Sequence, residues 1–172
     1  MALPLVPPFP LIAEPGAWDV LSLWAGTVFL EAEGEPAEGK LGVAWVMRHR
    51  IDTWGLTLHQ VVLGPEGLAY GESRAYEPFS CWNDDYRARA AARLSGASGA
   101  ALEACWRAAV GALWRLVTDP VPGALYYLNL EQTRRLRKAH DLPSWAADPD
   151  DATRVDPAKL VGVMGRHHFL TA

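Results

Sequence analysis

The fold is decided by residues 17–51, AWDVLSLWAGTVFLEAEGEPAEGKLGVAWVMRHRI. At about 100° per residue, Trp24, Val28 and Glu31 fall on one face of a helix in the first half of this stretch. The other side of the same helix is less regular. The pattern predicts a helix over about 17–32 with one buried face.

A second helix follows after a short break. Gly34 is a typical helix terminator, and Pro36 suits the first turn of a helix because its φ is already helical. Apolar periodicity then predicts further helices over about 84–94, 100–117 and 131–139, and strands over about 124–128 and 159–164. Along the 100–117 helix, Leu116 is expected on the buried stripe. The sequence therefore predicts a predominantly helical α+β fold with a small β element.

Length and composition indicate a single domain. The 172 residues are 50% hydrophobic, enough for one core. Residues 1–16 contain five prolines and no Lys or Arg, which predicts a Pro-rich lead-in followed by one domain over 17–172. The two cysteines, Cys81 and Cys105, could form one bridge, but two inert thiols are the favoured expectation.

The charge narrows the class of partner. A net charge of −4 argues against a dedicated nucleic-acid binder, and the longest charge-free helical stretch, Val20–Leu30, is too short to span a bilayer. We therefore expect no nucleic-acid or membrane partner, a monomer, and a cytoplasmic location because no signal peptide is visible.

Four carboxylates lie within the eight residues Glu31–Glu38. By helical period, Glu33 points roughly 160° away from Glu31, so only Glu31 is directed towards the apolar interior. Burial favours the protonated form of a carboxyl group, and cleavage of a glycosidic bond needs such a general acid. The alternatives are a buried structural glutamate or an acidic, solvated helix end.

Amides are scarce, and both asparagines have aromatic neighbours. Asn83 follows Trp82, and Asn129 lies two residues after Tyr127. Sugar-binding clefts are typically lined by aromatic rings and amides, since rings cover apolar sugar faces and amides bond hydroxyls. Tyr126 and Tyr127 alternate across a predicted strand, so that one faces a groove while the other packs. Simple packing would also explain the rings.

Other catalytic motifs are missing. The sequence has no His-Glu-x-x-His, Cys-x-x-Cys, P-loop or Gly-x-Ser-x-Gly motif, and the spacing of His140, His167 and His168 matches no standard metal site. We expect no metal and no cofactor. The basic run Arg134–Lys138 is either one solvated helix face or a surface that attracts an anionic polymer, including carboxylate-bearing cell wall.

Four blocks in order resemble the SleB-type cell wall hydrolases, which include spore cortex-lytic enzymes and phage endolysins. The blocks are Glu31–Pro36 with the run to Arg50, Phe79–Asn83, Asp119–Asn129, and Pro143–Trp145 with Gly165–Phe169. They resemble the family's Glu-x-Arg-Gly-Glu-Pro, Phe-Ser-x-Trp-Asn, Asp-Pro-x-x-Gly-Ala-x-Tyr-Tyr-x-Asn and Gly-x-His-x-Phe motifs. One departure is Glu33, which stands where the family has arginine.

The resemblance implies a lysozyme-like fold and cleavage of the MurNAc–GlcNAc backbone of peptidoglycan, with Glu31 as the catalytic acid. The residues expected to bind substrate are Ser80, Trp82, Asn83, Tyr126, Tyr127, Asn129 and His167. No second carboxylate is clearly placed, which favours a lytic transglycosylase giving 1,6-anhydro-MurNAc. If Glu35 or Asp84 supplied that carboxylate, the enzyme would be a hydrolytic muramidase.

Two other classes remain open. One is a non-catalytic wall-binding domain in which Glu31 is structural. The other is a peptidoglycan amidase or peptidase, which needs zinc or a Cys/His pair, with Cys81 as the candidate nucleophile. A lone catalytic domain without an export signal resembles a phage endolysin, held in the cytoplasm until release to the wall.

Overall fold

The computed structural model describes residues 15–64, 79–82, 84–97, 99–136 and 142–172. Its helices are the 3₁₀ turns η1 (Pro15–Ala17) and η2 (Ser80–Trp82), and α1 (Val20–Ala32), α2 (Ala37–Trp54), α3 (Leu58–Leu63), α4 (Asp84–Ser95), α5 (Gly99–Leu113) and α6 (Leu130–Leu136). Its strands are β1 (Tyr126–Asn129), β2 (Leu160–Met164) and β3 (His167–Leu170). The prediction of a predominantly helical α+β fold is confirmed.

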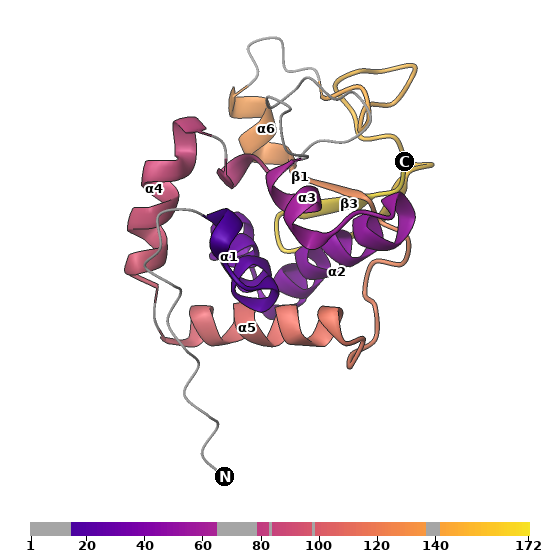
Figure 1. Cartoon of the computed structure of the whole chain (residues 1–172). Helices are drawn as coiled ribbons and strands as arrows, with labels where there is room; N and C mark the ends of the chain where they lie inside the picture. Colours follow the sequence, from indigo (N-terminus) through magenta and orange to yellow (C-terminus); the bar gives the residue numbers. More distant parts are fainter. Residues whose placement is uncertain (1–14, 65–78, 83, 98, 137–141) are drawn as a thin grey trace.

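Helix α1 lies at the centre of the molecule (Figure 1). Asp19 begins it as an N-cap, because its side chain accepts a hydrogen bond from the backbone N–H of Ser22 at 2.9 Å. Every residue from Ser22 to Leu30 is buried, so the prediction of a single buried face is wrong. The reason is that α2, α3, α4 and α5 all contact this helix and together cover its sides.

The turn from α1 to α2 is closed by a buried lysine. Lys40 donates from Nζ to the carbonyl oxygen of Glu33 at 2.8 Å and also to that of Glu35. A cation at this place satisfies carbonyl groups at the end of α1 and complements the helix dipole. The turn that holds the acidic residues is therefore fixed from the interior.

The sheet is antiparallel, with the order β1-β3-β2. Strand β3 was not predicted as a strand, yet it is the central one and pairs with both neighbours. In its pairing with β1, His167 lies opposite Asn129, and Phe169 lies opposite Tyr127. This register places the C-terminal motif beside the Tyr-Tyr-x-Asn motif.

Helix α5 ends earlier than the apolar pattern predicts. Arg115 takes a left-handed conformation with φ of 52°, and the N–H of Leu116 turns back to the carbonyl of Gly111 at 2.9 Å. Leu116 is consequently 68% exposed, so its predicted burial is wrong.

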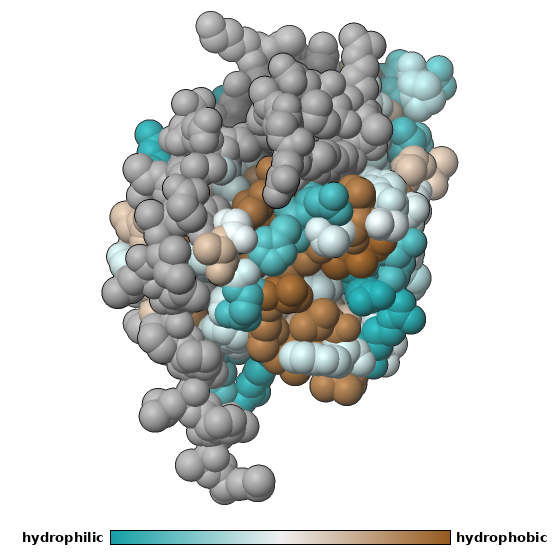
Figure 2. Space-filling view, in the orientation of Figure 1, coloured by the Kyte–Doolittle hydropathy of each residue, from teal (hydrophilic) through white to brown (hydrophobic). Residues whose placement is uncertain are grey.

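Figure 2 shows hydrophobic patches separated by hydrophilic residues on one face of the molecule.

The structure also describes the state of the two cysteines and the length of the apolar helices. Cys81 and Cys105 are both free thiols, as expected. Among the described residues, no helix has the length and apolar character needed to cross a membrane.

Candidate active site

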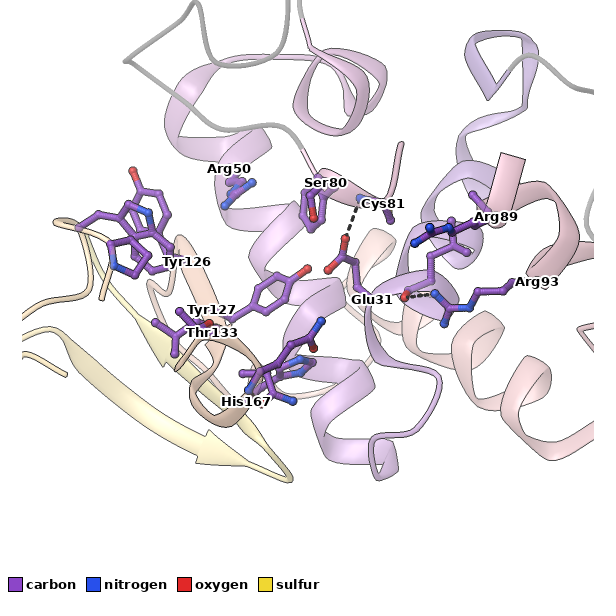
Figure 3. A pocket seen from close by; sticks show the side chains of 18 residues that line it. Glu31, Arg50, Ser80, Cys81, Arg89, Arg93, Tyr126, Tyr127, Thr133 and His167 are labelled. Carbon is purple, nitrogen blue, oxygen red and sulfur yellow. Dashed lines mark hydrogen bonds between the residues drawn. The ribbon is translucent and has the colours of Figure 1, made fainter. Parts of the chain in front are cut away.

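A pocket of about 510 Å³ opens where α1, η2, α4 and the β1–β3 edge of the sheet meet. Six of the predicted site residues line it together: Glu31, Ser80, Tyr126, Tyr127, Asn129 and His167. Figure 3 shows Glu31 in the middle of this pocket, with Tyr126 and Tyr127 on one side and Arg89 and Arg93 on the other.

Glu31 is in the last turn of α1, and its side chain is partly buried. Its Oε1 accepts a hydrogen bond from the backbone N–H of Cys81 in η2 at 3.3 Å. The Tyr127 hydroxyl points towards the same carboxylate (Figure 3). The helical phase thus correctly separated Glu31 from Glu33, which is exposed.

The two neighbours of Glu31 are held in their neutral forms. Burial raises the pKa of the Tyr127 phenol well above its ordinary value, and the nearby Glu31 carboxylate raises it further. Burial also raises the pKa of the Cys81 thiol well above its ordinary value, again assisted by Glu31. Because the thiolate is the nucleophilic form, Cys81 is poorly suited to covalent catalysis.

An aromatic wall lies on the sheet side of the pocket. The rings of Tyr126 and Trp145 are stacked, with centroids 5.0 Å apart and an interplanar angle of 22°. The guanidinium of buried Arg50 lies 5.5 Å from the centroid of Tyr126 and 4.8 Å from that of Phe79. Its Nε donates to the carbonyl of Leu125 at 2.7 Å, which fixes the start of β1. Arg50 therefore positions the aromatic wall by cation–π contacts.

His167 forms part of the floor of the pocket. It is only 5% exposed, and its ring lies 5.0 Å from that of Tyr127 in an edge-on arrangement. Burial lowers the pKa of His167, although the carboxylates of Glu35 and Glu31 oppose this shift. Among the described residues, its Nδ1 has no hydrogen-bond partner. Because this Nδ1 is itself buried, His167 contributes ring surface to the pocket floor rather than that nitrogen.

Asn129 has two roles because it ends β1 and precedes α6. Its Oδ1 accepts a hydrogen bond from the backbone N–H of Gln132 at 3.0 Å, which caps α6. The same residue lines the pocket. Its amide is therefore held in a fixed orientation at the rim.

Two of the predicted substrate-binding residues are not placed in the pocket. Trp82 is buried and does not line it; its Nε1 donates to Thr27 Oγ1 at 2.9 Å, and its ring contacts Trp18. This is a core position, occupied because the indole is large and Thr27 offers a buried acceptor. Asn83 lies outside the described residues.

Glu35, a candidate for a second catalytic carboxylate, is engaged elsewhere. It is 6% exposed, does not line the pocket, and accepts hydrogen bonds from the backbone N–H and the Nε of Arg166 at 2.8 and 2.7 Å. Burial raises the pKa of Glu35, but the bonds from Arg166 outweigh it and hold the pKa below its usual value. The side chain of Asp84, the other candidate, lies outside the described residues.

Sequence reasoning missed several pocket residues. The described lining also includes Arg50, Phe79, Arg89, Arg93, Gln132, Thr133 and Trp145. The Pro-Ser-Trp block indicated Trp145, and the first block reached Arg50, but neither pattern showed that these side chains meet at one place. Arg89 and Arg93 carry no signal besides their spacing of one helical turn. Among the described residues, no cluster of three or more His, Cys, Asp or Glu is placed to hold a metal ion.

Comparison with known proteins identifies the family to which this chain belongs. A family model described as Cell Wall Hydrolase matches residues 34–169, which include the pocket residues of η2, α4, the sheet and Trp145. The match starts at Gly34, so Glu31 lies just before it. No curated protein and no solved structure matches the chain. Since the family model covers most of the chain, the protein belongs to the SleB-type cell wall hydrolases, enzymes that act on peptidoglycan.

Proposed function

We propose that this enzyme cleaves the MurNAc–GlcNAc bond of the peptidoglycan glycan strand, with Glu31 as general acid and then general base, and that it acts as a lytic transglycosylase. One observation supports this reading above the others. Among the described residues that line the pocket, Glu31 is the one carboxylate. A hydrolase using two carboxylates would need a second one within about 5–10 Å of the first.

The surroundings of Glu31 fit a sugar polymer. The stacked pair of Tyr126 and Trp145 offers apolar ring faces, and Asn129 offers an amide at the rim. His167 adds part of the pocket floor beneath them. Apolar faces with a few placed polar groups are what a sugar ring requires.

The reaction is proposed in two steps. Glu31 first gives its proton to the glycosidic oxygen, and the bond between that oxygen and C1 of MurNAc breaks, releasing the GlcNAc hydroxyl. The Glu31 carboxylate then takes the proton of the MurNAc C6 hydroxyl, whose oxygen bonds to C1. The product is 1,6-anhydro-MurNAc, and Glu31 is protonated again, so no water is consumed.

Product analysis tests the proposal. Purified peptidoglycan is digested in water enriched in heavy oxygen, and the soluble muropeptides are analysed by mass spectrometry. We expect anhydro-MurNAc ends without the label. Labelled reducing-end MurNAc would show a hydrolytic muramidase instead, and cleavage in the peptide stems would show an amidase or peptidase.

The site assignment is tested with a matched pair of variants. Glu31→Gln should release no soluble fragments, whereas Glu38→Gln, an exposed acid in the first turn of α2, should digest wall like the wild type. Wild-type protein that pellets with wall but never releases fragments would indicate a binding domain. Glu31→Gln that lyses at the wild-type rate would contradict the site.

A further inference from the structure

Two arginines of α4 form the side of the pocket opposite the tyrosines. Arg89 and Arg93 are four residues apart, so both lie on one face of the helix, and both line the pocket. Figure 3 shows them on the far side of Glu31 from Tyr126 and Tyr127. The geometry points to a second binding site here, one for an anionic group of the substrate.

The local charge contrasts with that of the whole chain. The chain has a net charge of −4, yet three arginines and one glutamate are present among the described lining residues. Both Arg89 and Arg93 are exposed, so their side chains are accessible to a ligand in solution. A concave surface with such an excess of arginine concentrates anions.

Arg93 is held in place by contacts around the end of α1. Its Nη1 donates to the carbonyl of Leu30 at 3.0 Å, and its Nη2 donates to Glu33 Oε2 at 3.1 Å. A guanidinium has more N–H donors than these two contacts use. Arg93 is therefore oriented next to the catalytic helix with donors remaining for a ligand.

Glu33 orients Arg93. Its carboxylate forms an ion pair with the Arg93 guanidinium at 3.1 Å. The carboxylate of Glu33 is 46% exposed and does not line the pocket, so its role is to position Arg93.

We infer that Arg89 and Arg93 bind a carboxylate on the muramic acid side chain of the glycan strand. This inference rests on the function proposed above. In peptidoglycan the candidate groups are the carboxylates of the peptide stem and, on MurNAc residues that carry no stem, the free lactyl carboxylate. Arginine suits both because its planar N–H groups match a carboxylate in a bidentate arrangement.

The test compares wall before and after its charges are removed. One portion of peptidoglycan is kept native, and in the other the carboxyl groups are converted to methylamides with carbodiimide and methylamine. The double variant Arg89→Gln/Arg93→Gln should lose about tenfold in kcat/KM on native wall at low salt, with a smaller loss at high salt. On amidated wall the double variant should match the wild type. The kcat/KM of the wild type should itself be about tenfold lower on amidated wall than on native wall.

Controls separate binding from folding and from catalysis. Arg107→Gln, on α5, also removes an exposed arginine with a glutamate one turn away but does not touch the pocket, so it should behave like the wild type. Far-ultraviolet circular dichroism checks that the double variant folds, and the single variant Arg93→Gln gives a milder test. Pelleting of these variants with wall in a Glu31→Gln background gives a readout that does not need catalysis.

A third substrate identifies the source of the carboxylate. Glycan strands stripped of peptide by an amidase carry only lactyl carboxylates, which the cleavage of the amide sets free. A loss that persists on these strands assigns the lactyl carboxylate, and a loss that vanishes assigns the stem. An equal loss on native and amidated wall, or no loss on native wall, would overturn the inference, while the result with Glu31→Gln decides the proposed function separately.

Discussion

The backbone N–H of Cys81 donates to Glu31 Oε1 at 3.3 Å, across a sequence separation of 50 residues. The bond joins η2 to the last turn of α1, so the carboxylate is oriented by a main-chain donor. A side-chain substitution at position 81 leaves that donor in place, unless it introduces proline.

The thiols should resist alkylation in the folded protein. Burial raises the pKa of Cys81 well above its ordinary value and raises that of Cys105 to about 12, so the thiolate is scarce at neutral pH. With iodoacetamide at neutral pH, mass spectrometry should find both cysteines unmodified after a time that fully modifies the unfolded chain. Rapid native modification of Cys81 would contradict the assigned environment.

Removing the Tyr127 hydroxyl should slow catalysis without unfolding the protein. Tyr127→Phe keeps the ring against Phe79, His167 and Phe169 but removes the hydroxyl that points towards Glu31. We expect kcat on purified wall to fall about tenfold with KM little changed, as for removal of a hydroxyl that faces a charged group. An unchanged kcat would remove Tyr127 from the catalytic arrangement.

The charge on Glu35 should stabilise the fold in a pH-dependent way. Its pKa is lower in the folded protein than the ordinary value of 4.5, so the stabilisation is fully present at neutral pH and is lost as the pH falls through the folded value. Glu35→Gln should lower the free energy of unfolding by about 1–3 kcal/mol at neutral pH, and the difference should shrink in acid. Urea titrations at several pH values measure this. The control is Glu38→Gln, which is exposed and should show little difference at any pH.

Gly42 should tolerate no side chain. A Cβ at this position would lie 2.5 Å from Cζ of Phe169, a fully buried ring of the central strand. Gly42→Ala should destabilise the protein by about 1–3 kcal/mol, the usual cost of overpacking. Gly162→Ala is the control because nothing lies within 4 Å of its Cβ position. Adding Phe169→Leu to Gly42→Ala should recover part of the loss; a variant that is as stable as the wild type would contradict the packing.

Arg115→Gly should stabilise the protein despite losing an ion pair. Arg115 holds φ at 52°, which is strained for a residue with a Cβ, whereas its ion pair with Asp52 is exposed. We expect a gain of about 0.5–1 kcal/mol, visible as a higher melting temperature. Arg115→Ala loses the pair but keeps the strain, so it should show no such gain.

Helical periodicity and short motifs predicted those features that depend on residues close together in the chain. Helical phase identified α1 and separated Glu31 from Glu33, because a period of 3.6 residues follows from the backbone alone. The pairing of ring and amide at Tyr127 and Asn129 likewise indicated a cleft. Helix α5 was predicted too long because apolar spacing continues past Leu113, whereas the chain turns left-handed at Arg115.

The remainder of the site depends on contacts between distant segments. Trp145 meets Tyr126, and Arg93 meets Glu33, only after the helices and sheet have assembled. The periodicity of a single helix or strand carries no information about contacts between distant segments. For Trp82 the motif was misleading. It predicted a place in the cleft, whereas the indole Nε1 donates a hydrogen bond to Thr27 in the core.

The place of β3 has a consequence for biosynthesis. Both β1 and β2 pair with it, and because it follows both in the chain it leaves the ribosome after them. Until then β1 has no partner strand, and His167 and Phe169 are not yet beside Tyr127. The nascent polypeptide therefore cannot complete this pocket before β3 has been translated.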